Sequence, residues 1–164
     1  MTSKAIVTRR GFMFGASAFG LAAYAGHDIA PKSAFSGEIK GRRLKIAAIG
    51  CGGMGGSATE SLISAGCDLV AVCDIDPSAF DKWEKKYPGI PKFTDYRDML
   101  KAMGDKFEAV QVGTPDHTHA YISIDCMNAG KHVYVQKPLA RTVEECELML
   151  KTSLRTRRDR KSVV

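Results

Sequence analysis

The chain has 164 residues, enough for one domain of ordinary size, and 45% of them are apolar, a normal share for a globular protein. The net charge of +6 is carried by the two ends: residues 1–43 and residues 151–164 contribute +5 each, whereas residues 44–150 sum to −4. Because a nucleic-acid site needs a basic face on the folded domain, this distribution argues against nucleic acid as a partner.

Residues 1–42 have the pattern of an export signal followed by a linker. The pair Arg9 and Arg10 precedes an uncharged stretch at 11–26, which is rich in Ala and Gly and ends near a small-residue site at 23–25. The stretch is shorter than the ~20 apolar residues of a transmembrane helix, so we expect no stable membrane anchoring. We predict export to the bacterial periplasm by the twin-arginine route. An ordinary basic N-terminus and an uncleaved anchor are the alternatives.

Strand-like and helix-like segments alternate after the linker. Apolar runs predict strands at 44–49, 69–73, 93–94, 109–112 and 132–135. Helices are predicted at 57–65, 76–87, 95–103 and 118–129, and from Thr142 onward. Their ends carry capping signals, such as Asp76 before Pro77, and Thr142 with Glu145 in a capping box. Because the strands are apolar on both faces, we predict an α/β domain with a doubly wound parallel sheet covered by helices on both sides.

Five glycines fall within eight residues between the first predicted strand and the first predicted helix. Gly50, Gly52 and Gly55 fit the pattern G-x-G-x-x-G, and Gly53 and Met54 lie inside it. In a dinucleotide-binding domain, the first glycine allows a tight turn and the second lets the backbone approach a pyrophosphate. The third lets helix and strand pack closely. A Lys-Ser or Lys-Thr pair does not follow, which excludes a P-loop.

An acidic residue at the end of the second predicted strand completes this pattern. Asp74 lies nineteen residues after Gly55, where a dinucleotide site places a carboxylate on a ribose hydroxyl. A carboxylate there repels a 2′-phosphate, so we expect NAD rather than NADP. Asp76 is the rival, although its position before Pro77 suits a helix cap better. An S-adenosylmethionine-binding fold, which also uses a glycine loop and an acid, is the alternative.

Two later motifs are more specific: VGTPDHTHA at 112–120 and GKHVYVQKPLA at 130–140. With the glycine loop and CDIDP in the same order, residues 43–151 resemble the glucose–fructose oxidoreductase/inositol dehydrogenase (Gfo/Idh/MocA) family. The resemblance implies the NAD(P)-binding Rossmann domain of an oxidoreductase that moves hydride between nicotinamide and a sugar or polyol, usually as a homo-oligomer. An NAD-dependent glycosidase of the same fold and a non-catalytic dinucleotide-binding module are the alternatives.

The resemblance also implies roles for individual residues. Thr114 and Pro115 would line the cofactor near its nicotinamide end, with His119 close by. Lys137 and Pro138 match the family's Glu-Lys-Pro motif, in which the lysine reaches the substrate and takes a catalytic part. Lys137 taken alone could equally be a solvated lysine at the end of a strand.

One position departs from that motif, because Gln136 stands where the family has glutamate. Its amide can still hydrogen-bond a ribose hydroxyl, but a carboxylate beside the motif's lysine is lost. His117 and His119 could form an H-x-H metal pair, but only Asp116 lies near them in the sequence, and we predict no metal site. The five cysteines show neither zinc-type spacing nor a disulfide framework.

Members of the family continue into a second α/β domain that supplies most of the substrate pocket. No such domain follows Lys151, and residues 152–164 show no apolar periodicity. We therefore expect the dinucleotide-binding domain to end at residue 151 and the remainder to be a foreign tail from a truncated or chimeric reading frame. The 164 residues alone are expected to bind a dinucleotide weakly and to turn nothing over.

Overall fold

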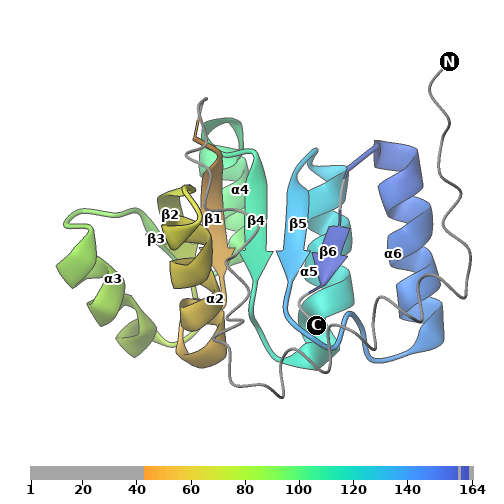
Figure 1. Cartoon of the computed structure of the whole chain (residues 1–164), viewed down its shortest axis with the longest axis horizontal. Helices are drawn as coiled ribbons and strands as arrows, with labels where there is room; N and C mark the ends of the chain where they lie inside the picture. Colours follow the sequence, from red (N-terminus) through yellow and green to blue (C-terminus); the bar gives the residue numbers. More distant parts are fainter. Residues whose placement is uncertain (1–42, 159, 163–164) are drawn as a thin grey trace, which may run out of the picture. The chain divides into compact units, whose positions relative to one another are not determined.

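The computed structural model describes residues 43–158 and 160–162, which form a parallel sheet flanked by helices (Figure 1). The predicted export signal lies outside these residues. The strands are β1 Lys45–Ile49, β2 Asp68–Cys73, β3 Lys92–Phe93, β4 Ala109–Val112, β5 His132–Val135 and β6 Arg160–Ser162. They lie in the order β3-β2-β1-β4-β5-β6, and each described pairing is parallel. The predicted doubly wound sheet is confirmed.

Helices connect successive strands. They are α2 Gly53–Ser64, η1 Pro77–Phe80, α3 Asp81–Lys86, α4 Tyr96–Met103, η2 Gly104–Lys106, η3 Asp116–Thr118, α5 His119–Asn128 and α6 Val143–Thr156, where η marks a 3-10 helix. The predicted start of the first helix is wrong, because α2 begins at Gly53 rather than at residue 57. The helix predicted over 76–87 is divided into η1 and α3. The capping box at Thr142 is confirmed.

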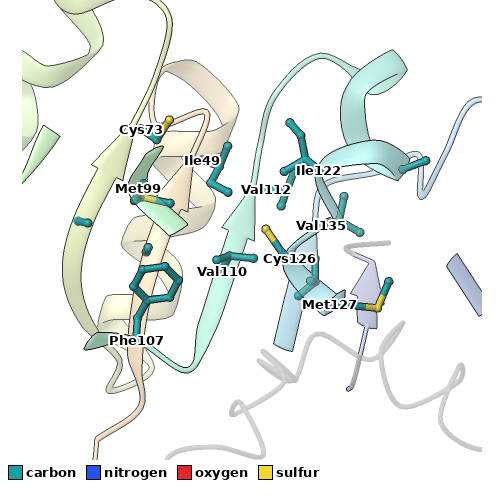
Figure 2. Packing of buried hydrophobic residues seen from close by; sticks show 14 of the residues in the cluster. Ile49, Cys73, Met99, Phe107, Val110, Val112, Ile122, Cys126, Met127 and Val135 are labelled. Atoms are coloured by element: carbon teal, nitrogen blue, oxygen red, sulfur yellow. The ribbon is translucent and has the colours of Figure 1, made fainter. Parts of the chain in front are cut away.

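Two apolar clusters hold the helices on opposite faces of the sheet. On one face, β-strand residues pack against α4, α5 and Met149 of α6. Figure 2 shows part of this cluster, with Val110 and Val112 of β4 beside Ile122 and Cys126 of α5. On the other face, a second cluster joins α2, η1 and α3 to β1 and β2. A sheet covered in this way leaves its strand ends as the place where a ligand can reach the backbone.

Regular structure continues past residue 151, where the sequence analysis places the end of the domain. Helix α6 continues to Thr156, and Thr152 is only 4% exposed. Arg157 ends the helix in the left-handed conformation, with φ of 54°. The chain then enters β6, which pairs with β5. The arginine-rich composition hid this continuation, because only one face of the last turns is buried.

Across residues 43–158 and 160–162, helices long and apolar enough to cross a membrane are absent.

Candidate functional site

The candidate site lies at the carboxyl ends of β1, β2, β4 and β5, where the strand order reverses between β1 and β4. Open α/β sheets bind ligands at this switch point. Two hollows meet at Gly113 and Thr114, which line both. The large pocket has a volume of about 550 Å³ and the small pocket about 140 Å³.

The large pocket is lined by Ile49, Gly50, Gly52, Cys73, Asp74, Ile75, Thr94, Tyr96, Gly113, Thr114, Pro115, His117, Thr118 and Ile122. The small pocket is lined by Met54, Gly113, Thr114, Asp116, His119, Gln136 and Lys137. Of the predicted site residues, Gly53, Gly55 and Pro138 line neither pocket. The others are gathered at this one edge of the sheet.

Two glycines of the G-x-G-x-x-G motif, Gly50 in the loop after β1 and Gly55 in the first turn of α2, are required by the fold itself. Gly50 has φ of +76°, and a Cβ built on it would lie 2.6 Å from the carbonyl carbon of Gly113 and from the amide nitrogen of Thr114. A Cβ on Gly55 would overlap the carbonyl oxygen of Gly50. These contacts bring α2 and the loop after β4 against the glycine loop, which is the packing role predicted for the third glycine.

Gly52 is different, because the fold does not require a glycine there. Its φ is −86°, and a Cβ would lie 3.4 Å from the Cβ of Ala79, an ordinary contact distance. As the N-cap of α2, Gly52 offers no side chain to the first turn, and that turn contains no acidic residue. The partial positive charge of the helix end is therefore not compensated by these residues, which suits an anion such as a diphosphate.

Asp74 connects the glycine loop to the second strand. Its Oδ2 accepts hydrogen bonds from the backbone N–H groups of Cys51, at 2.9 Å, and Gly52, at 3.2 Å. Its Oδ1 accepts from the N–H of Asp76 at 3.1 Å. A carboxylate has about four acceptor positions, so Asp74 retains capacity for a ribose hydroxyl.

Asp76, the rival acid, has another role. It is the N-cap of η1, and its Oδ1 accepts from the N–H of Ser78 at 2.9 Å. Hydrogen bonds from Ser78 lower the pKa of the Asp76 carboxyl. The helix-cap interpretation of Asp76 fits the structure, and Asp74 is the carboxylate in the large pocket.

An apolar wall of the large pocket escaped the sequence analysis. Ile75 is 87% exposed beside Asp74, and Tyr96 approaches from the start of α4. The Tyr96 hydroxyl donates to Oδ2 of Asp125 at 2.7 Å, and burial together with Asp125 raises the pKa of this phenol. The one available sequence signal was the helix cap at Asp95, which places Tyr96 just after β3.

The two cysteines near the glycine loop, Cys51 and Cys73, have buried thiols. Burial, with a further contribution from Asp74, raises the pKa of the Cys51 and Cys73 thiols to about 12. Both thiols are therefore neutral near pH 7. All five cysteines are free. Trp83 is fully buried, and its Nε1–H donates to the carbonyl oxygen of Cys51 at 2.9 Å. This hydrogen bond attaches the glycine loop to α3.

The small pocket brings the motif after β5 next to the motif after β4. Gln136 is half-buried, and its backbone N–H donates to the carbonyl oxygen of Val112 at 2.9 Å. The next residue, Lys137, is exposed. The peptide bond between Lys137 and Pro138 is cis. Asp116, which the sequence analysis weighed only as a metal neighbour, supplies the carboxylate of this pocket.

The two histidines of the H-x-H pair are directed to different places. His117 is exposed and lines the large pocket, whereas His119 is buried and lines the small one. Within residues 43–158 and 160–162, groups of three or more His, Cys, Asp or Glu side chains that could hold a metal ion are absent. Nδ1 of His119 lies 2.7 Å from the carbonyl oxygen of Pro138, and Nε2 lies 2.8 Å from that of Thr114.

Together these residues fit a dinucleotide. The side-chain-free Gly52 at an uncompensated helix end suits a diphosphate, and Asp74 with an apolar wall suits an adenosine. The small pocket, with its amide, carboxylate and lysine, lies where the other end of such a ligand would reach.

Comparison with known families agrees with this geometry. Residues 44–159 match the model of the Gfo/Idh/MocA family, described as an oxidoreductase family with an NAD-binding Rossmann fold. The match includes residues 152–159, which the sequence analysis had placed outside the domain.

Solved structures of dehydrogenases are similar to this chain. The WlbA dehydrogenase of Chromobacterium violaceum, in complex with NADH and UDP-GlcNAcA, is 29% identical, with a TM-score of 0.68 over 76% of this chain and 36% of that one. The myo-inositol 2-dehydrogenase of Lactobacillus plantarum is 28% identical, with a TM-score of 0.65 over 74% of this chain and 36% of that one.

Two curated relatives are named as glycosidases rather than as dehydrogenases. The alpha-N-acetylgalactosaminidase of Shewanella oneidensis is 33% identical over 126 residues, which are 71% of this chain and 27% of that protein. A glycosyl hydrolase family 109 protein of another Shewanella strain matches equally well. This chain thus spans about a quarter of the length of the curated relatives it matches.

Proposed function

Because the chain belongs to the Gfo/Idh/MocA oxidoreductase family, we propose that it is the nucleotide-binding domain of an NAD-dependent oxidoreductase that acts on a sugar or polyol. The single observation that carries the proposal is the arrangement around Gly52. There, an open helix end and the Asp74 carboxylate line one pocket, and a second pocket with Lys137 adjoins it.

The large pocket is proposed to bind the adenosine half of the cofactor. Asp74 would accept hydrogen bonds from a ribose hydroxyl, and Ile75 and Tyr96 would contact the adenine. The described lining residues include no Lys or Arg that could pair with a 2′-phosphate. The charge of Asp74 opposes such a phosphate, which supports NAD over NADP.

The small pocket is proposed to receive the nicotinamide end and the reacting carbon of the substrate. Bound NAD would supply the hydride acceptor or donor. Thr114 and Gln136 would orient the nicotinamide ribose through hydrogen bonds. Lys137, exposed at the pocket mouth, would contact a substrate hydroxyl and assist the movement of its proton.

An NAD-dependent glycosidase is the second candidate, and the names of the Shewanella relatives favour it. In such an enzyme the sugar would be oxidised and re-reduced within one turnover, so that no net NADH appears. The residues of the two pockets serve either reaction equally, because both need the same cofactor next to a sugar.

Further parts of the proposal concern the whole protein. We infer periplasmic export by the twin-arginine route from the pattern at residues 1–42, and homo-oligomer formation from the family resemblance. Fusing residues 1–42 to a reporter protein, with and without Arg9→Lys and Arg10→Lys together, tests the route. Reporter activity that reaches the periplasm equally well in both forms would contradict it.

The chemistry is tested in a protein of the relatives' length that carries this domain. Net NADH formation with a free sugar or polyol supports the dehydrogenase. Cleavage of a glycoside without net NADH supports the glycosidase instead. Tight NAD binding with neither reaction would identify a non-catalytic dinucleotide-binding module and would contradict both.

A further inference from the structure

Helix α6 carries a line of exposed apolar side chains on the face turned away from the core. Val143, Leu150 and Leu154 are 71%, 44% and 71% exposed. Their spacings of seven and four residues place them within about 40° of one another around the helix. Met149 and Thr152, which are buried, lie on the opposite side. We call the three exposed residues the α6 stripe.

The α6 stripe is more than a scatter of exposed apolar residues. Single exposed apolar side chains are common on folded proteins, but a continuous apolar strip along one helix is typical of a contact surface. Helix α6 is the last helix on its side of the sheet, beyond α5, and it precedes the edge strand β6 (Figure 1). Its outer face can therefore receive another helix without any change in the fold.

The charged residues of α6 are arranged by sign along the helix. Glu144 and Glu147 lie in its first half, and Lys151 and Arg155 lie in its second half. Glu147 and Lys151 are exposed and pair with each other at 3.5 Å, whereas Arg155 donates to Oδ1 of Asn128 on α5. An acidic first half and a basic second half are complementary to a copy of the same helix that runs in the opposite direction.

A second α6 in antiparallel orientation matches the stripe and the charges at once. Val143 of one copy then lies opposite Leu154 of the other, and Leu150 of both copies lies near the middle. In this register, Glu147 of one copy comes within one residue of facing Lys151 of the other, and a two-fold axis repeats every contact. Ion pairs that flank an apolar seam in this way set the orientation of paired helices.

We propose that the α6 stripe is the interaction surface for a second copy of this chain, which docks its own α6 in antiparallel orientation. The proposal rests on the proposed function only in that it assigns a surface to the homo-oligomer inferred there. It does not depend on the pockets, because the stripe residues line neither of them. Three apolar residues from each copy form a small interface, so we expect a dissociation constant on the order of 10–100 µM.

Sedimentation equilibrium of the 164-residue chain tests the surface. The wild type should pass from monomer to dimer over a range of about 1–500 µM. Each dimer contains every stripe residue twice, so Leu150→Gln and Leu154→Gln should each raise the dissociation constant about tenfold or more. Leu44→Gln changes a leucine of 42% exposure just before β1. It is the matched control for Leu150→Gln and should leave the dissociation constant within about twofold of the wild type.

Reversal of the charges tests the antiparallel orientation. Glu147→Lys and Lys151→Glu should each weaken self-association about threefold or more, because each brings like charges together across the pair. The two variants mixed in equal amounts should associate more tightly than either alone, because every facing pair in the mixed dimer has opposite charges. A mixture that associates no better than its two components would overturn the antiparallel docking.

Other outcomes also decide the proposal. A chain that stays monomeric over the whole range would overturn it, and residues 11–26 of the same chain or a different protein would then be the candidates to cover the stripe. A dimer that Leu150→Gln and Leu154→Gln leave unchanged would overturn it as well. If the glutamine variants fail to fold, the charge reversal decides alone.

Calorimetry with NAD separates this proposal from the proposed function. A monomeric chain that binds NAD would contradict the docking surface and leave the proposed function intact. A chain that dimerises as expected but binds no NAD would contradict the proposed function and support the surface. The stripe variants should bind NAD with the affinity of the wild type, because their changes lie outside both pockets.

Discussion

The large and the small pocket share Gly113 and Thr114 but are built on different principles. In the large pocket, Asp74 is fixed by three backbone N–H groups, and the Tyr96 ring is fixed by Asp125. In the small pocket, Lys137 is exposed, and the loops around it meet through His119. The adenosine diphosphate site proposed here is therefore fixed by hydrogen bonds within the domain, whereas the small pocket has an exposed lysine between two loops that both contact His119.

The largest effects are expected from two glycine substitutions, one that should disrupt the fold and one that should not. Gly55→Ala introduces a Cβ that overlaps the Gly50 carbonyl oxygen, and we expect it to lower the free energy of unfolding by about 3 kcal/mol or more. Gly52→Ala has room and an ordinary φ, so its unfolding free energy should stay within about 1 kcal/mol of the wild type.

The same pair differs in what it does to ligands. The added methyl of Gly52→Ala would stand between the backbone and a diphosphate, and NAD affinity should fall about tenfold or more. Urea unfolding and calorimetry with NAD measure the two effects. Unchanged NAD affinity in Gly52→Ala, or equal stability of the two variants, would show that the glycine loop is shaped by packing alone.

Asp74→Asn is expected to weaken the contacts that a ligand makes in the large pocket and to leave the small pocket unchanged. The amide loses the charge that supports hydrogen bonds from the loop and from a ribose, so NAD affinity should fall about 10–100-fold. The preference for NAD over NADP should shrink, because the charge that repels a 2′-phosphate is gone. Asp98→Asn, an exposed carboxylate of α4 with 69% side-chain exposure, is the matched control and should leave both values unchanged.

Tyr96→Phe keeps the apolar ring and tests the hydrogen bond that holds it, and its effect on stability is expected to depend on pH. Loss of the hydrogen bond to Asp125 should lower the free energy of unfolding by about 1 kcal/mol near pH 7. The pKa of the Tyr96 phenol is raised in the folded state, so this stabilisation is complete below the unfolded value of about 10 and is lost as the pH rises further. Wild type and variant should therefore converge in stability above about pH 10. A constant difference up to pH 11 would contradict the assignment.

Thr142→Ala is the smallest expected perturbation and the reference for all the others. The variant loses the side-chain bond to the Glu145 N–H at the start of α6, which should cost about 0.5–1 kcal/mol. The capping box lies outside both pockets, and NAD affinity should be unaffected. A loss of affinity comparable with that of Asp74→Asn would mean that binding follows global stability rather than the named contacts.

The sequence predicted most of the features that depend on residues close together in the chain, such as the bounds of strands. The bounds of β4 and β5 were predicted residue by residue, because each is a short apolar run between clear turn signals. Asp74 was found because a strand end fixes where its side chain lies. The start of α2 was missed because glycines are poor helix formers, and here the packing of Gly55 against Gly50 and Gly113 overrides that propensity.

Features that depend on segments far apart in the chain were not predictable from the sequence alone. Tyr96 lines the large pocket at the start of α4, and its hydroxyl donates to Asp125 of α5, 29 residues further along the chain. Asp116 and Lys137 meet in one pocket because β4 and β5 are adjacent in the sheet. The double contact of His119 requires the positions of two loops, which no local pattern in the sequence specifies.

The most direct test of the central claim is a calorimetric titration of this chain with ADP-ribose, NAD and S-adenosylmethionine, in the wild type and in Asp74→Asn. The account predicts that ADP-ribose and NAD bind at one site and compete, that Asp74→Asn weakens both, and that S-adenosylmethionine gives no heat. Absence of heat with about 1 mM ADP-ribose and NAD, or equal affinities in the wild type and Asp74→Asn, would contradict it.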